Sequence, residues 1–88
     1  MEIQIEIKKR NRDFGIITWP LSLDFEIKTL FEQKNRIDLL YNDKTLKNRK
    51  VSYKYRKFSI GKKRLESMSD KKYFILSKKG SAIRISGR

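Results

Sequence analysis

The sequence predicts a single, mostly β domain of seven strands and two short helices over residues 1–88. Three observations lead to this prediction. Short apolar runs alternate with polar residues along much of the chain, which is typical of strands with one buried face. Turn-forming residues separate these runs at short intervals, as they do in small β domains. A chain of 88 residues also has enough apolar side chains for one modest core.

The first two strands are expected near the N-terminus. Isoleucines alternate with polar residues over 2–8, which predicts a strand with one buried face. Residues 8–13 carry four basic side chains and are expected to form an exposed connection. The run 14–19 is apolar and β-branched, and it stops before Pro20, which lacks the N–H that a sheet needs.

Two helices interrupt the later strands. Ser22 or Asp24 is expected to cap an amphipathic helix over about 23–33, and a shorter helix is expected over about 62–68. The apolar face of the first helix is assigned to the core and comprises Phe25, Ile27, Leu30 and Phe31. The remaining predicted strands span 37–41, 46–53, 55–60, 73–77 and 82–86.

The overall charge points to an anionic partner. The chain has 23 Lys and Arg against 10 Asp and Glu, for a net charge of +13. Such a balance favours a phosphate polymer or an anionic surface. No apolar window approaches the ~20 residues of a membrane span, so we expect a cytoplasmic protein without a membrane partner. The chain has no Cys and no His, which excludes disulfides, thiolate metal sites and imidazole ligands, and no cofactor is expected.

Positive charge is concentrated in two stretches. Residues 47–57 contain six basic side chains among eleven and no acid, and Tyr53 and Tyr55 interrupt them. Residues 8–13 form the second stretch. Dense charge of one sign repels itself until a polyanion neutralises it, and tyrosines can stack on bases. Both stretches are therefore expected to contact nucleic acid. The alternative for residues 47–57 is a Lys-rich edge strand that discourages aggregation.

Side-chain chemistry divides these residues into two groups. Lysines hold phosphates, whereas Arg and Asn can bond a base edge with two hydrogen bonds. The candidate base readers are Arg10, Asn11, Arg12, Asn48, Arg49 and Arg56. The full set of candidate DNA-binding residues is Lys8, Lys9, Arg10, Asn11, Arg12, Lys47, Asn48, Arg49, Lys50, Tyr53, Lys54, Tyr55, Arg56 and Lys57. Trp19 is expected to pack in the core or at its rim.

Two parts of the chain share one order of elements. Residues 14–20 (FGIITWP) align with residues 55–61 (YRKFSIG), and a predicted helix follows each. After the helices, residues 36–44 match residues 72–80, and both segments begin a hairpin. We interpret the chain as two strand-helix-strand-strand repeats. The repeats span about 12–51 and 54–86.

This repeated unit resembles the AbrB and MazE type of swapped-hairpin DNA-binding domain. Two units in one chain are similar to the DNA-binding pseudobarrel of plant transcription factors and some restriction enzymes. The resemblance implies a seven-stranded open pseudobarrel whose halves are related by an approximate two-fold axis. It also implies two arms that grip the major groove, at the places where residues 8–13 and 47–57 fall. Gly61 departs from the pattern, because it stands where the first copy has Pro20.

We therefore predict sequence-preferring binding of double-stranded DNA. The biological setting would be a transcriptional regulator, an antitoxin-like repressor or a recognition module. A monomer is expected, with a dimer as the alternative. RNA binding through Tyr53, Tyr55 and Trp19 is a second hypothesis, and an interaction module for an acidic protein is a third. No enzymatic activity is expected, because no glycine-rich phosphate loop or activated nucleophile is visible.

Overall fold

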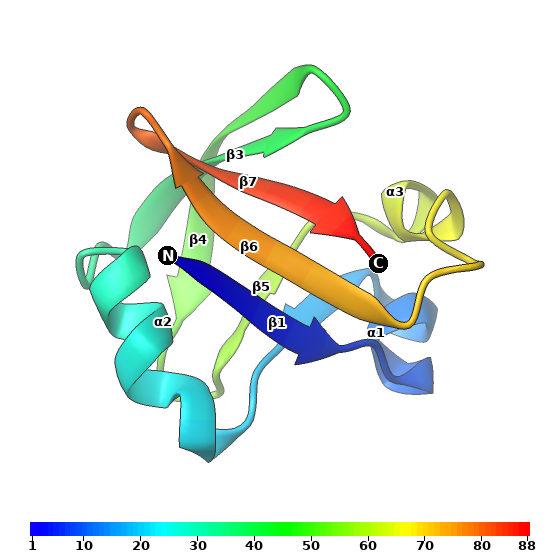
Figure 1. Cartoon of the computed structure of the whole chain (residues 1–88), viewed down its shortest axis with the longest axis horizontal. Coiled ribbons are helices and arrows are strands. Elements are labelled where there is room, and N and C mark those ends of the chain that lie inside the picture. Colours follow the sequence, from blue (N-terminus) through cyan, green and yellow to red (C-terminus); the bar gives the residue numbers. More distant parts are fainter.

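The computed structural model describes residues 1–88 as one seven-stranded sheet that curls almost into a closed barrel, with three short helices (Figure 1). The predicted mostly β fold of seven strands is confirmed. The elements are β1 (Glu2–Glu6), α1 (Lys9–Phe14), β2 (Ile16–Thr18), a 3₁₀ turn η1 (Leu21–Leu23), α2 (Asp24–Leu30), β3 (Arg36–Tyr41), β4 (Lys44–Ser52), β5 (Lys57–Ser59), α3 (Lys62–Glu66), β6 (Tyr73–Lys79) and β7 (Ala82–Gly87). None of the helices has the length and apolar character needed to cross a membrane.

The hydrophobic core fills the inside of the curled sheet. Twenty buried residues form one cluster, to which every strand contributes. Its aromatic part is built around Trp19, which is only 3% exposed. The ring centroid of Trp19 lies 6.1 Å from that of Phe31, and the Phe31 centroid lies 5.6 Å from that of Phe58. Both pairs meet edge to face, a favourable geometry for aromatic rings. The expectation that Trp19 packs in the core is confirmed.

One helix was not predicted from the sequence. Residues 8–13, expected to be an exposed connection, lie mainly in α1. This helix ends at Gly15, whose left-handed conformation (φ 67°) lets its N–H donate to the carbonyl of Asn11. A Cβ on Gly15 would lie 2.4 Å from the backbone nitrogen of Lys62, so only glycine fits where the end of α1 meets the start of α3.

One predicted core residue faces solvent instead. Ile27, Leu30 and Phe31 are buried as expected, whereas Phe25 is 79% exposed. Buried positions spaced three and four apart lie on one helix face. Phe25 precedes Ile27 by two residues, about 200° around the helix, and so it points away from the sheet.

The repeated order of elements is present, but the strand pairing does not exchange the two halves. Each half supplies a strand, a helix and an antiparallel hairpin, β3–β4 in the first and β6–β7 in the second. Under a two-fold exchange, the pairing of β4 with β5 would be matched by a pairing of β7 with β2. Instead, β7 pairs with β6 and runs parallel to β3. The two-fold relation expected between the halves is therefore absent from the sheet.

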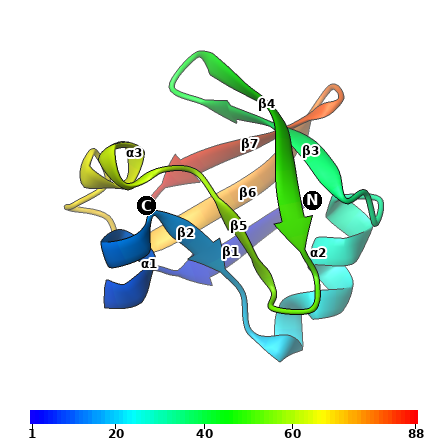
Figure 2. The ribbon, with the colours of Figure 1, turned by 180° about the vertical axis from the view of Figure 1, so that it is seen from behind.

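The barrel is left open along one line. The strand order is β1-β6-β7-β3-β4-β5-β2, so β1 and β2 are the two free edges. Helix α1 joins these two strands and covers one end of the gap between them (Figure 2). We call this gap the seam. The turn of residues 53–56, which joins β4 to β5, lies next to the edge formed by β2.

Candidate nucleic-acid interface at the barrel seam

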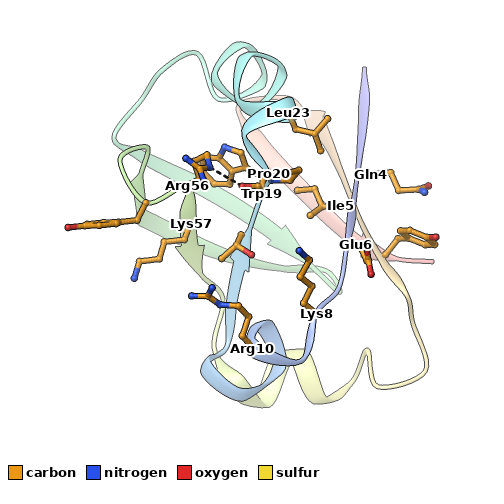
Figure 3. Close-up of a pocket in the computed structure, with 13 residues that line it drawn as sticks. Gln4, Ile5, Glu6, Lys8, Arg10, Trp19, Pro20, Leu23, Arg56 and Lys57 are labelled. Atoms are coloured by element: carbon orange, nitrogen blue, oxygen red, sulfur yellow. Dashed lines mark hydrogen bonds between the residues drawn. The ribbon is translucent and has the colours of Figure 1, made fainter.

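A groove of about 680 Å³ follows the seam. Its walls come from β1, from β2 and the residues after it, from the start of α1 and from the β4–β5 turn (Figure 3). Four of its lining residues are cations and one is a carboxylate, which are Lys8, Arg10, Arg56, Lys57 and Glu6. The structure thus brings parts of both predicted basic stretches to one concave surface. We call it the seam groove.

Lys8 and Arg10 enter the groove from the end occupied by α1. Their position is fixed by Asn11, whose side-chain Oδ1 accepts the N–H of Lys8 at 2.7 Å. The Asn11 Nδ2 group donates to Thr18 Oγ1 at 2.9 Å and so ties α1 to β2. Asn11 is completely buried and both ends of its amide are occupied. Its prediction as a base reader is therefore wrong.

Arg12 is also committed within the protein. Its guanidinium donates to the carbonyl oxygen of Met68 at 2.8 Å and to that of Lys71 at 2.6 Å. These bonds fix the segment after α3 against α1. Arg12 is consequently not free to bond a base, and this prediction is also wrong. Lys9, in contrast, is exposed and pairs only with Asp13 at 3.1 Å, a contact that solvent screens.

Arg56 and Lys57 enter the groove from the opposite side. The carbonyl of Arg56 accepts the N–H of Trp19 at 3.2 Å, and the Nε of Arg56 donates back to the Trp19 carbonyl at 3.3 Å. Figure 3 shows this contact together with Lys8 and Arg10, which rise from the other end of the groove. Arg56 adopts a left-handed backbone (φ 51°), which turns the chain sharply before β5. Lys57 follows as the first residue of β5.

The two tyrosines of the basic stretch have different environments. Tyr55 is 64% exposed, and Lys54 Nζ and Lys57 Nζ lie 5.4 and 5.6 Å from its ring centroid. An exposed ring flanked by two ammonium groups is suited to stack on a base while the lysines meet phosphates. Tyr53 instead donates its hydroxyl to the Lys34 carbonyl at 2.6 Å and packs against Trp19. Partial burial raises the pKa of the Tyr53 phenol. Tyr53 is thus a structural residue.

The remainder of the second basic stretch lies outside the groove. Lys47 and Lys50 are exposed on β4, and Arg49 is half-buried there. Asn48 has φ 60° and donates its backbone N–H to Asp38 Oδ1 at 2.9 Å, in an irregular part of the β3–β4 pairing. The structure therefore divides the predicted arm. Residues 55–57 line the seam groove, whereas residues 47–50 lie along β4.

Asp24, the first residue of α2, makes two internal contacts. Asp24 accepts Lys28 Nζ at 2.8 Å and the Trp19 Nε1–H at 3.0 Å. These two hydrogen bonds lower the pKa of the Asp24 carboxyl. The structure contains no group of three or more Asp or Glu side chains that could hold a metal ion.

Several residues of the groove had not been singled out from the sequence. Gln4, Glu6 and Thr18 line it because β1 and β2 are sheet edges, and edge position depends on pairing across the whole chain. A signal for α1 was present, because Gly15 follows a run of helix-compatible residues and is the residue type that most often ends a helix. Comparisons of the chain with protein-family models, with curated proteins and with solved structures found no match.

Proposed function

We propose that this protein binds nucleic acid, with double-stranded DNA as its partner, through phosphate contacts along the seam groove. The observation that carries the proposal is the convergence of Lys8 and Arg10 with Arg56 and Lys57 on one concave surface. Arg10 and Arg56 are 46 residues apart in the sequence, so their proximity is a product of the fold. Cations gathered from separate segments repel one another, and a bound polyanion removes that cost.

Charge outside the groove supports a duplex as the partner. Lys9 and Lys54 are exposed beside the seam, and Lys47 and Lys50 extend the positive surface along β4. A duplex presents two phosphate backbones and can meet a broad positive surface of this kind. In this arrangement lysines set register and affinity. Arg10 and Arg56 remain as candidate base readers in the groove, and Asn48 and Arg49 as candidates on β4.

One observation favours RNA as a second candidate. The exposed ring of Tyr55, with a lysine on either side, can stack on an unpaired base of a loop or single strand. A duplex keeps its bases stacked, and Tyr55 would then contact sugar and phosphate. Whether Tyr55 stacks on an unpaired base or contacts sugar and phosphate therefore distinguishes RNA from duplex DNA.

Fluorescence anisotropy tests the proposal directly. A labelled DNA duplex and a structured RNA of equal charge are titrated at matched salt from about 50 to 200 mM. Contact with six to ten phosphates predicts a loss of roughly 10³ to 10⁵ in affinity over that range. A shallow salt dependence contradicts phosphate binding, and preference for the RNA transfers the proposal to the second candidate.

Selection of sites from a random duplex library then measures sequence preference. An enriched short motif supports a specific reader in the cytoplasm, such as a transcriptional regulator, an antitoxin-like repressor or a recognition module. Recovery of no motif contradicts specific reading and leaves only attachment to the backbone. Because both repeats lie in one chain, we propose that a monomer is sufficient for binding.

A further inference from the structure

We propose that the seam also accepts an extended, acidic segment of a partner protein, which pairs with β1 as an additional strand. This inference goes beyond nucleic-acid binding, because the partner would be held by main-chain hydrogen bonds as well as by charge. An unpaired sheet edge offers a row of N–H and C=O groups to another strand. The seam has two such edges facing one groove.

The orientation of the β1 backbone shows which groups are free. Ile7 donates its N–H to the carbonyl of Lys72, the residue before β6. The backbone N–H and C=O groups of successive residues point to opposite sides of a strand. The backbone groups of Ile5 therefore also point toward β6, and those of Gln4 and Glu6 point toward the seam. The only sheet partner of β1 is β6, so these seam-facing groups have no partner strand.

The β2 edge is shorter and less complete. Trp19 donates its N–H to Arg56, so the backbone of Thr18 faces the seam by the same alternation. Pro20 follows and has no N–H to offer. β1 has five residues and β2 has three. An added strand therefore finds more hydrogen-bonding groups on β1.

The positive charge around the groove favours an acidic segment as the occupant. Lys8, Arg10 and Lys57 lie around the groove, and Glu6 is its one carboxylate. A second copy of this chain is disfavoured as the occupant, because each copy has a net charge of +13. A strand whose outward side chains are Asp or Glu would meet these cations while its backbone pairs with β1.

Hydrogen exchange read residue by residue tests the proposal. The probe is a short peptide that alternates valine with glutamate. At saturation it should slow exchange at the amides of Gln4 and Glu6, the seam-facing positions of β1. A control peptide N-methylated at the pairing positions keeps the charge but cannot form the ladder, and it should not slow exchange there. Unchanged exchange with the first peptide, or equal protection by the control, overturns the proposal.

A variant separates this proposal from nucleic-acid binding. Gln4→Pro removes one seam-facing N–H and no charge, and proline is tolerated on the free side of an edge strand. It should weaken the peptide up to about tenfold, while the salt dependence of duplex binding stays unchanged because no cation is lost. Unchanged peptide binding by a folded Gln4→Pro variant contradicts strand addition. The exchange measurement on the unmodified protein decides the question if this variant fails to fold.

Discussion

Trp19 and Arg56 are joined by two hydrogen bonds, both of which involve the backbone of Trp19. The Trp19 N–H donates to the Arg56 carbonyl at 3.2 Å, and the Arg56 Nε donates to the Trp19 carbonyl at 3.3 Å. The Trp19 ring is buried in the core, whereas the Arg56 side chain lines the seam groove. The residue that anchors the aromatic core thus also positions a cation of the candidate site.

Asn11 should contribute to stability and not to binding. Asn11→Ala removes a buried amide and leaves the N–H of Lys8 and the hydroxyl of Thr18, which are partly buried, without their partner. We expect the free energy of unfolding to fall by about 1–3 kcal/mol, measured by urea denaturation. Arg10→Ala, one residue earlier and exposed, is the control and should change it by less than about 0.5 kcal/mol. Equal stability of the two variants would contradict the structural role of Asn11.

Substitutions at two glycines with similar backbone conformations distinguish the cost of a left-handed backbone from the cost of steric crowding. Gly15 and Gly80 have φ of 67° and 61°, but an added Cβ meets Lys62 only at Gly15. Gly80→Ala should cost about 1–2 kcal/mol, the price of a left-handed alanine. Gly15→Ala should cost at least about 1 kcal/mol more, because α1 and α3 must separate. Thermal unfolding of both variants provides the comparison, and equal costs would show that the two helices are not in close contact.

Asp24 should make stability depend on pH. Hydrogen bonds from Lys28 and Trp19 lower its pKa in the folded protein below the ordinary value of about 3.9. The resulting stabilisation is present above that value and is lost as the pH falls through the folded-state pKa. Asp24→Asn should therefore be less stable than the unmodified protein at pH 7, with the difference shrinking below about pH 4. Urea midpoints followed by Trp19 fluorescence measure it, and a difference that is constant with pH excludes this linkage.

The two tyrosines should separate binding from stability. Tyr55→Ala removes an exposed ring and should leave the melting temperature nearly unchanged, while nucleic-acid affinity falls roughly tenfold. Tyr53→Ala removes the hydrogen bond to Lys34 and the contact with Trp19, so it should mainly lower the melting temperature. Calorimetry and anisotropy on both variants test the pair. If Tyr55→Ala lowers the melting temperature and Tyr53→Ala lowers the affinity, the assignment of Tyr55 to the interface is contradicted.

Local patterns were sufficient to predict most elements of the fold. Strict alternation identified β1, and Asn42 and Asp43 adopt the left-handed backbone that their hairpin turn requires (φ 47° and 63°). The pattern was insufficient for α1, because its stability comes from distant contacts. Arg12 bonds carbonyls more than 50 residues away, and Asn11 is buried against β2. Neither contact leaves a periodic apolar signal in the sequence.

The candidate site was predicted in part for the same reason. Charge density singled out Lys8, Arg10 and Lys57, because clustering is visible in the sequence, and the fold places these residues along one groove. It did not reveal that Asn11 and Arg12 are used internally, because burial depends on how α1 packs. It also did not reveal the seam, which exists because β1 and β2 remain unpaired after all other strands are placed.

The most direct test compares two triple variants of equal charge. Lys8→Ala, Arg10→Ala and Lys57→Ala together remove three of the four cations that line the groove. Lys44→Ala, Lys79→Ala and Arg84→Ala remove exposed cations on β4, β6 and β7 that do not line it. The measurement is the slope of log affinity for a DNA duplex against log salt. The seam variant should lose about 3 units of slope, one for each phosphate contact, and the control variant should keep the original slope. Equal slopes for the two variants would contradict binding at the seam.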